Sequence, residues 1–218
     1  MRLNLLAQKG ELIPTRLYLI RHGQVADGHT HRYHGNNDIP LSPHGVRQLE
    51  RLAIRLAEVN LAAVYASDLR RAYQGAEILC RGRNLTPQAR RQFREIHFGV
   101  WEGLSFSEIM THYPRELEAR LQDLAHYRLP EGESLMDVRS RVLPELQQIL
   151  EDHQGKAVAL VAHAGVNRVI LCDALELDLR HIFRLDQRYG CLNIIDYYHD
   201  LAVVRLINGE GYEVGGKR

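Results

Sequence analysis

The sequence is poor in cysteine and has no long hydrophobic run. Its 218 residues include only three cysteines, Cys80, Cys172 and Cys191, an odd number without the short spacings of metal sites. We therefore expect neither a disulfide framework nor a zinc motif, and sparse cysteines favour a reducing, cytoplasmic compartment. No window approaches the roughly 20 apolar residues that span a bilayer, and the broken apolar start does not resemble a signal peptide.

Lysine and net charge are also scarce. Arginine accounts for 25 of the 28 basic residues, and 27 acidic residues leave a formal net charge of +1. A net charge this small supports neither a nucleic acid nor an anionic membrane as a partner. Arginine binds phosphate and carboxylate groups through a planar fork that lysine lacks, although a genome-wide bias in composition would explain the same excess. The 12 histidines also need an explanation.

What is present is typical of one globular domain, 1–218, with 45% hydrophobic and 25% charged residues and no linker or repeat. Short apolar runs alternate with helical patterns, and a hairpin closes the chain. The expected strands are 16–20, 62–66, 157–162, 192–198 and 201–207, and the expected helices are 43–56, 69–79, 135–149 and 166–175. This alternation predicts an α/β fold, a three-layer α/β/α sandwich with a mainly parallel sheet.

Two segments lie outside this alternation. Residues 105–133 are predicted to form one or two short helices with Pro114 between them, as a small helical cap insertion. Residues 1–15 form an N-terminal extension before the first strand. Farther along the chain, Pro144 is expected to kink the helix in which it lies.

Cationic groups follow the predicted strands. Arg21 and His22 follow the first strand, Arg71 follows the second, and His163 follows the run 157–162. Ligands of such sheets bind beyond the carboxyl ends of the strands. Two guanidiniums and two imidazoles would repel one another unless an anion lay between them, and a phosphoryl group fits forked arginine donors. An imidazole nitrogen can also attack phosphorus.

Each of these signals is weak alone. A histidine after a buried strand is more often structural, and two adjacent arginines are more often a solvated helix start. Their coincidence at one edge of the sheet favours a functional site. Five ordered elements strengthen this interpretation: LIRHGQ (19–24), NDIPLSPHG (37–45), SDLRRAYQGA (67–76), REIHFGVWEG (94–103), and GES (132–134) with VAHAG (161–165). Together they resemble the motifs of the histidine phosphatase superfamily, also called phosphoglycerate mutase-like.

The resemblance implies the fold of that superfamily and five catalytic residues. His22 would be the nucleophile that becomes phosphohistidine, and Glu95 would be the general acid and then the base that activates water. The residues implied to hold the phosphoryl oxygens are Arg21, Arg71 and His163. Neither a metal nor a cofactor is expected, because the arginines supply the positive charge. The alternative for Glu95 is a surface carboxylate paired with the arginines at positions 90, 91 and 94.

The segment 29–35 contains three histidines, which could suggest a metal site. No nearby carboxylate or cysteine completes a ligand set, so we expect a substrate-facing loop instead. In this interpretation Arg32, His34 and Gly35 line the mouth of the site and bind substrate.

The substrate is predicted from shorter segments. Only 67 residues lie between Glu95 and His163, whereas mutases of this superfamily resemble one another in a longer insertion, so a phosphatase is favoured. Residues 183–197 resemble the α-ribazole phosphatases, which implies α-ribazole 5′-phosphate, a metabolite of cobalamin synthesis. The alternatives are a broad-specificity sugar or nucleotide phosphatase, a phosphoglycerate mutase, and a non-catalytic phospho-ligand binding module, which would not need Glu95. The expected partner is a small phosphorylated metabolite, and the oligomeric state stays open, with a homodimer as one alternative.

Overall fold

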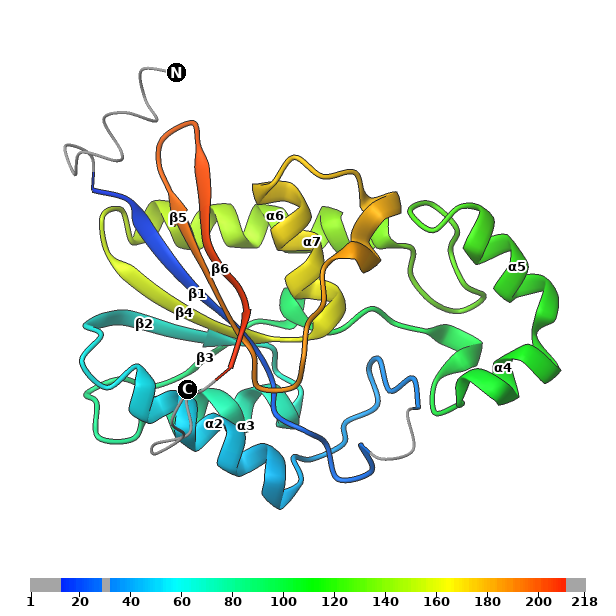
Figure 1. Ribbon diagram of the computed structural model, residues 1–218, viewed down its shortest axis with the longest axis horizontal. Coiled ribbons are helices and arrows are strands. Elements are labelled where there is room, and N and C mark those ends of the chain that lie inside the picture. The colour runs from blue at the N-terminus through cyan, green and yellow to red at the C-terminus, as the bar shows by residue number, and fades with distance from the viewer. Residues whose placement is uncertain (1–12, 29–31, 211–218) are drawn as a thin grey trace, which may run out of the picture.

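The computed structural model describes residues 13–28 and 32–210. These residues form a six-stranded sheet in the order β3-β2-β4-β1-β5-β6 (Figure 1). The strands are β1 Thr15–Arg21, β2 Leu61–Ala66, β3 Gln88–Ala89, β4 Ala157–Ala162, β5 Leu192–Tyr197 and β6 Ala202–Gly209. Strand β1 pairs in parallel with β4, β4 with β2, and β2 with β3, whereas β5 is antiparallel to both β1 and β6. The predicted mainly parallel sheet with a terminal hairpin is confirmed.

Helices cover both faces of this sheet. In Figure 1, α2 and α3 lie on one face and α6 and α7 on the other, which confirms the three-layer sandwich. The α-helices are α2 Pro43–Arg55, α3 Arg70–Cys80, α4 Phe106–His112, α5 Pro114–Gln122, α6 Leu135–Asp152 and α7 Ala164–Ala174. Three short 3-10 helices, η1 Arg91–Phe93, η2 Gly99–Trp101 and η3 Leu179–Arg184, lie in the connections.

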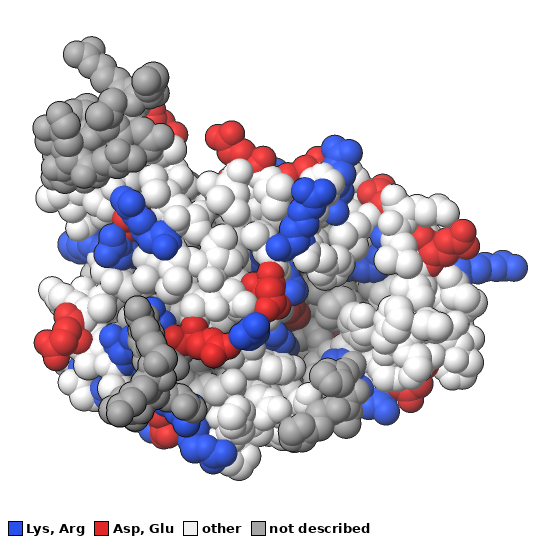
Figure 2. All heavy atoms as spheres, in the orientation of Figure 1, with Lys and Arg blue, Asp and Glu red and all other residues white. Residues whose placement is uncertain are grey.

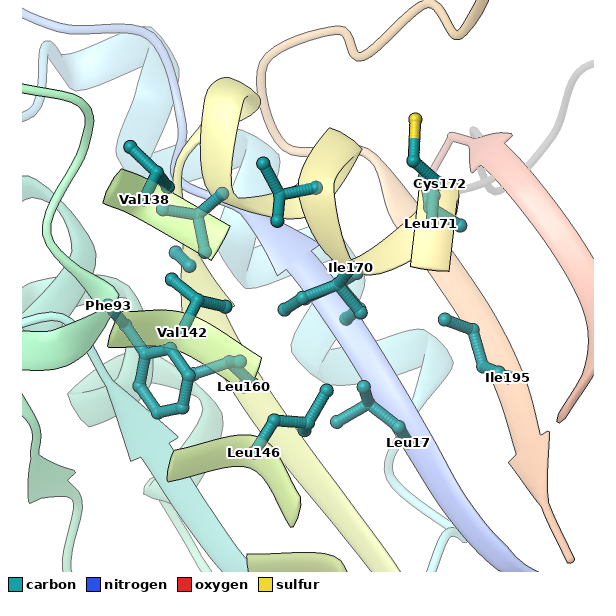
Figure 3. Close-up of a cluster of buried hydrophobic side chains, with 14 of the residues drawn as sticks. Leu17, Phe93, Val138, Val142, Leu146, Leu160, Ile170, Leu171, Cys172 and Ile195 are labelled. Atoms are coloured by element: carbon teal, nitrogen blue, oxygen red, sulfur yellow. The ribbon is translucent and has the colours of Figure 1, made fainter. Parts of the chain in front are cut away.

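The central strand β1 shows why the sheet needs both layers. Leu17 and Leu19 belong to the apolar cluster that faces α6 and α7, part of which Figure 3 shows. Tyr18 and Ile20 belong to the cluster on the opposite face, with α2 and α3. Successive side chains of a strand point to opposite faces, so a strand buried on both faces reads as a continuous apolar run.

Two helices begin as their sequences predict. The Ser42 side chain accepts a hydrogen bond from the Gly45 N–H at 3.0 Å, with Pro43 at the first helical position. Ser134 and Asp137 form a capping box at the start of α6. Pro144, which is expected to kink its helix, lies inside α6, which runs as one element from Leu135 to Asp152. Buried apolar side chains on both sides of the proline pack that helix against the sheet.

The segment 105–133 contains α4 and α5, and Pro114 begins α5. Its residues Ile109 and Leu129 pack with Trp101 in a cluster separate from those of the sheet, whereas Ala125 belongs to the cluster that faces α6 and α7. Figure 1 shows these helices beside the sandwich, on the side where β1 and β4 end. The cap therefore borders the edge of the sheet at which the cationic residues are predicted.

The described part of the chain begins close to the first strand. β1 begins at Thr15, one residue inside the predicted N-terminal extension, of which residues 1–12 lie outside the described part. All three cysteines are buried free thiols. Among the described residues, no helix combines the length and the apolar character needed to cross a membrane. Figure 2 shows basic and acidic side chains interspersed over one face.

Candidate active site

The site lies where β1 and β4 end. Arg21 is the last residue of β1 and pairs in register with Ala162, the last residue of β4. His22 and His163 directly follow these two strands. Their imidazole rings meet edge to face, with ring centroids 5.1 Å apart. The parallel register therefore brings together two histidines that are far apart in the sequence.

The environment of His22 favours a neutral ring with one free nitrogen. The side chain is 5% exposed, and Nδ1 lies 2.7 Å from the Gly23 carbonyl, to which the Nδ1–H donates. This contact leaves the Nε2 lone pair available. Burial lowers the pKa of His22 well below its ordinary value of 6.5, and the charges of Arg71 and Arg21 lower it further. A neutral imidazole of fixed tautomer is the form that can act as a nucleophile.

A cavity of about 140 Å³ opens in front of His22. The predicted residues that line it are Arg21, His22, Arg71, Glu95, Arg32, His34 and Gly35, together with Val25, Tyr33, Phe98 and Tyr189. His163 is fully buried beside it. Both ring nitrogens of His163 and Nε of Arg21 are buried without a hydrogen-bond partner among the described residues. Buried polar groups in native proteins are rarely unpaired, so these atoms point to a ligand.

Two of the three arginines that line the cavity, Arg21 and Arg71, are held by neutral oxygen atoms. Arg71, on α3 and 2% exposed, donates to the carbonyls of Gly35 at 2.5 Å and Asn37 at 2.7 Å. Arg21 donates to the Gln187 carbonyl at 2.5 Å. Carbonyl oxygens orient a guanidinium but do not neutralise it, so the positive charge stays available to an anion. Burial lowers the pKa of Arg71, and nearby carboxylates, Glu95 first among them, raise it.

Gly35 carries one of these carbonyls at a position where a side chain would not fit. Its φ is +40°, and a Cβ there would lie 2.0 Å from Oε1 of Glu102. The same Glu102 oxygen accepts hydrogen bonds from the N–H groups of Asn36 and Phe98, both at 3.0 Å. Glu102 thus organises the loop that positions Arg71.

Glu95 is held by backbone N–H groups at the rim of the cavity. Its Oε1 accepts from the Ile96 N–H at 2.9 Å, and its Oε2 accepts from the Gly165 N–H, in the first turn of α7, at 3.1 Å. Two of the three arginines that could have paired with it bind other carboxylates, Arg94 to Asp68 at 2.7 Å and Arg90 to Glu145 at 2.9 Å. Glu95 instead lines the cavity, with its carboxylate bound by backbone N–H groups.

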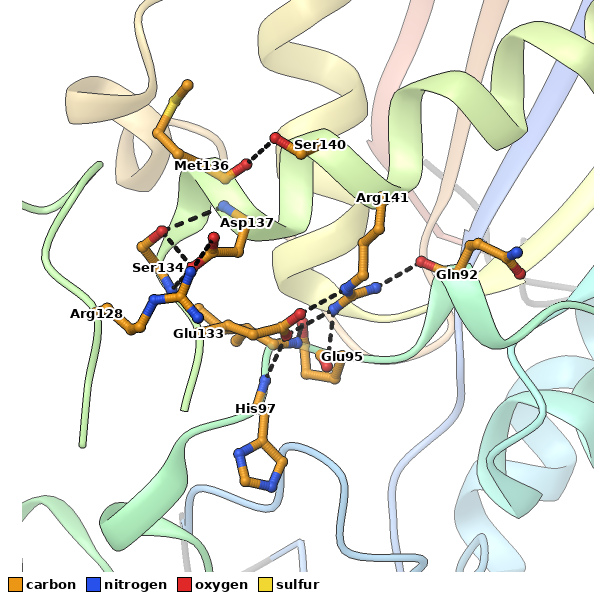
Figure 4. A network of polar contacts seen from close by, with 11 residues as sticks. Gln92, Glu95, His97, Arg128, Glu133, Ser134, Met136, Asp137, Ser140 and Arg141 are labelled. Carbon is orange, nitrogen blue, oxygen red and sulfur yellow. Dashed lines mark hydrogen bonds and ion pairs between the residues drawn. The ribbon is translucent and has the colours of Figure 1, made fainter. Parts of the chain in front are cut away.

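A polar network fixes the segment that carries Glu95 (Figure 4). Arg141 of α6 binds both oxygens of Glu133, at 2.8 and 2.9 Å, and donates to the Glu95 carbonyl at 3.2 Å. Glu133 in turn accepts from the His97 N–H at 2.9 Å. Glu133 of the GES motif therefore serves the site by positioning and does not line the cavity.

The loop at the opening of the cavity is hydrogen-bonded to the helical segment 105–133 through Glu108. Arg32 donates to the Gly103 carbonyl at 2.6 Å and to Glu108 of α4 at 2.9 Å. His34 lies 3.0 Å from Asp27, and burial lowers its pKa although Asp27 acts in the opposite direction. His29 and His31 lie outside the described residues. Within the described part of the chain, no three histidine, cysteine or acidic side chains are grouped so as to hold a metal ion.

Three residues that hold the site in place were not predicted from the sequence, nor were the lining residues Val25, Tyr33 and Phe98. Glu102 lies in the motif 94–103, but no role followed from its position there. Gln187 and Tyr189 lie in the run 183–197, whose resemblance to the α-ribazole phosphatases predicts a substrate but no role for either residue. Their importance depends on contacts with Arg21, whose Cζ lies 3.8 Å from the centroid of the Tyr189 ring.

Known proteins resemble this chain over most of its length. The family model of the histidine phosphatase superfamily (branch 1) matches residues 17–210. The bifunctional protein Rv2228c of Mycobacterium tuberculosis is 36% identical over 201 residues, which are 91% of this chain but only 55% of that protein. The chain thus spans about half the length of this relative. Phosphoserine phosphatase 1 of Hydrogenobacter thermophilus is 30% identical over 178 residues, 82% of each chain.

Solved structures share the fold of this chain. The structure of Bacillus stearothermophilus YhfR matches with a TM-score of 0.83 at 32% identity, covering 90% of this chain and 97% of that one. A putative α-ribazole-5′-P phosphatase from Escherichia coli matches with a TM-score of 0.83 at 26% identity, covering 92% and 100%. The family match over nearly the whole sandwich agrees with the histidines and arginines at the ends of its strands, and the chain belongs to the histidine phosphatase superfamily.

Proposed function

We propose that this chain hydrolyses phosphomonoesters through a phosphohistidine formed at His22. The observation that carries the proposal is a buried, neutral imidazole whose Nδ1–H is bound to the Gly23 carbonyl. Its free nitrogen faces a cavity that also contains two guanidiniums with no carboxylate partner. This combination suits attack on phosphorus within an anion-binding pocket.

The reaction has two steps. In the first, Nε2 of His22 attacks phosphorus, the bond from phosphorus to the ester oxygen breaks, and protonated Glu95 gives its proton to the leaving alcohol. In the second, Glu95 takes a proton from water, the water oxygen attacks phosphorus, and the N–P bond breaks. Inorganic phosphate leaves, and His22 and Glu95 return to their starting forms.

The two arginines and His163 act on the transferring phosphoryl group. Arg21, Arg71 and His163 surround His22, and the unpartnered Nε–H of Arg21 and one ring N–H of His163 can donate to phosphoryl oxygens. Because these groups are held in place before the substrate binds, they stabilise the transition state without reorganising.

Hydrolysis is favoured over mutase chemistry by the short connection between Glu95 and His163, which leaves few residues for a closing lid. For the substrate we propose α-ribazole 5′-phosphate. The support is the run 183–197 and an Escherichia coli relative, 27% identical over 91% of this chain, named adenosylcobalamin/alpha-ribazole phosphatase. Phosphoserine phosphatase 1 among the relatives keeps a broader or different specificity open to test.

The test is a phosphate-release assay run beside a phosphoglycerate mutase assay on one preparation. We expect release from α-ribazole 5′-phosphate, slower release from p-nitrophenyl phosphate, and negligible interconversion of 2- and 3-phosphoglycerate. Fast interconversion with little free phosphate would replace the hydrolase by a mutase. Hydrolysis of many esters without preference for α-ribazole 5′-phosphate would remove only the substrate assignment.

A second experiment separates an enzyme from a binding module built on the same fold. Brief reaction with a ³²P-labelled ester, followed by alkaline quenching, should leave an acid-labile, alkali-stable label on the protein. A protein that binds the ester but neither acquires label nor releases phosphate would be a binding module.

A further inference from the structure

The turn that joins η3 to β5 wraps around the end of β1. The Arg21 N–H donates to the Cys191 carbonyl at 3.1 Å, and the Gly190 N–H donates to the His22 carbonyl at 3.0 Å. The Arg21 guanidinium donates to the Gln187 carbonyl at 2.5 Å. Three backbone groups of one turn thus hold both the phosphate-binding arginine and the nucleophile.

The same turn places an aromatic ring on the guanidinium. The Cζ of Arg21 lies 3.8 Å from the centroid of the Tyr189 ring, well inside the range of a cation–π interaction. The Tyr189 ring also lies 5.6 Å from the His22 ring and lines the cavity. One edge and one face of the guanidinium are therefore occupied by neutral groups, while Nε stays unpaired.

A buried amide anchors this turn to the sheet. Gln187 is 2% exposed, and its Nε2 donates to Oδ1 of Asn193 at 2.7 Å. Asn193, a fully buried residue of β5, donates from Nδ2 to Oε1 of Gln187 at 2.9 Å and to the Leu19 carbonyl at 3.0 Å. These bonds join the turn to β5 and β1, so the turn cannot shift without breaking buried hydrogen bonds.

We propose that Tyr189 is a positioning residue: its ring, set by the turn anchored through Gln187, holds the Arg21 guanidinium in the orientation that receives the phosphoryl group. This inference rests on the proposed function. Arginine has several rotatable bonds, and fixing it before the substrate arrives removes an ordering cost from binding and from the transition state. A neutral ring achieves this without the competition for phosphate that a carboxylate would introduce.

The test removes the ring and then restores it. Tyr189→Leu should lower kcat/KM for p-nitrophenyl phosphate about tenfold and weaken inhibition by inorganic phosphate by a similar factor. Tyr189→Phe, which keeps the ring and loses the hydroxyl, should recover most of both losses. Arg188→Ala is the matched control in the same turn, because its side chain is exposed and binds Asp186 and Glu210. It should stay within about twofold of the wild type.

A double-mutant cycle shows whether Tyr189 acts through Arg21. In an Arg21→Met background, Tyr189→Leu should change kcat/KM by less than about twofold. A full tenfold loss in that background, an unaffected Tyr189→Leu enzyme, or a Tyr189→Phe enzyme as poor as Tyr189→Leu would each overturn the proposal.

Thermal unfolding of each variant verifies its folding. If Tyr189→Leu does not fold, Tyr189→Met removes the ring with a more adaptable side chain. The wild type separates the two levels of inference. A wild type without an acid-labile phosphoenzyme would overturn the proposed function. A labelled wild type together with an unaffected Tyr189→Leu enzyme would overturn only the role of Tyr189.

Discussion

The two ends of β1 each carry an arginine, and their partners differ. Near the start of the strand, Arg16 donates to both carboxylate oxygens of Asp196, at 2.6 and 2.9 Å. Asp196 also binds Arg205 at 2.8 Å. At the end of the strand, Arg21 binds a carbonyl and lies against the Tyr189 ring. The first arginine is paired with a carboxylate that it shares with Arg205, whereas the second is held by neutral groups.

The same contrast separates other arginines of the molecule. Arg94 is paired with Asp68, and Arg141 with Glu133, and neither lines the cavity. Arg71 does line it, and it is held by two carbonyls. The two arginines beside His22 are thus held by carbonyls, whereas Arg16, Arg94 and Arg141 outside the cavity are paired with carboxylates; Arg32, which also lines the cavity, is paired with Glu108. Four experiments test this difference, beginning with the one for which we expect the greatest effect.

Replacing the nucleophile should have the largest effect. His22→Ala removes the nitrogen that attacks phosphorus, so turnover should fall by several orders of magnitude and the acid-labile phosphoenzyme should disappear. Steady-state phosphate release and ³²P trapping measure the two effects. Near-normal turnover in this variant would contradict the mechanism.

Glu95→Gln should discriminate between leaving groups. General acid–base catalysis contributes about 10²–10⁴-fold, so release of alkyl alcohols should fall by about that factor. A phenolate leaves with little help from an acid, so formation of the phosphoenzyme from p-nitrophenyl phosphate should suffer far less. Burst kinetics with both ester types measure this, and equal losses in the first step would show that Glu95 is not the acid.

One conservative change should act differently at the two ends of the sheet. Arg71→Lys keeps the charge but loses the fork, and we expect a loss of about 2–4 kcal/mol in transition-state stabilisation. Arg16→Lys makes the same change in a partly exposed ion pair, and kcat/KM should be unchanged while the free energy of unfolding falls by at most about 1 kcal/mol. Steady-state kinetics and urea unfolding compare them. Equal kinetic losses would erase the distinction between the two kinds of arginine.

Acid should destabilise the two ends of β1 in different pH ranges. Burial lowers the pKa values of His22 and His163 in the folded protein well below 6.5. As the pH falls below 6.5, these two histidines therefore bind protons in the unfolded chain before they do so in the folded protein. Each histidine should remove up to about 1.4 kcal/mol of stability per pH unit until its folded pKa is reached. Burial raises the pKa of Asp196, but hydrogen bonds from Arg16 and Arg205 outweigh it and leave the pKa below 3.8. The contribution of Asp196 is therefore lost only under stronger acid.

Urea unfolding between about pH 7 and pH 5 measures this slope. His163→Gln, which does not titrate in this range, should reduce the slope by the share of one histidine. Arg16→Lys should leave the slope between pH 7 and pH 5 as in the wild type. A His163→Gln protein with the full wild-type slope would show that His163 is not the group responsible.

Much of the fold could be predicted from local patterns. The run 157–162 coincides with β4, and Ser42 and Pro43 begin α2 as expected. Pro144 lies inside α6 without ending it, and the kink expected there stays a prediction. The two-residue strand β3 was not predicted, since it is defined by its pairing with β2 and not by its own composition.

Motifs and apolar periods are local properties of the chain, so the sequence alone predicts the α/β architecture and five candidate residues, His22, Arg21, Arg71, Glu95 and His163. Which atoms of these residues are free depends on the tertiary structure. The Gly23 carbonyl sets the tautomer of His22, and the turn around Gln187 and Tyr189 holds Arg21. Contacts between residues more than 160 positions apart are set by the sheet, and no local pattern encodes them.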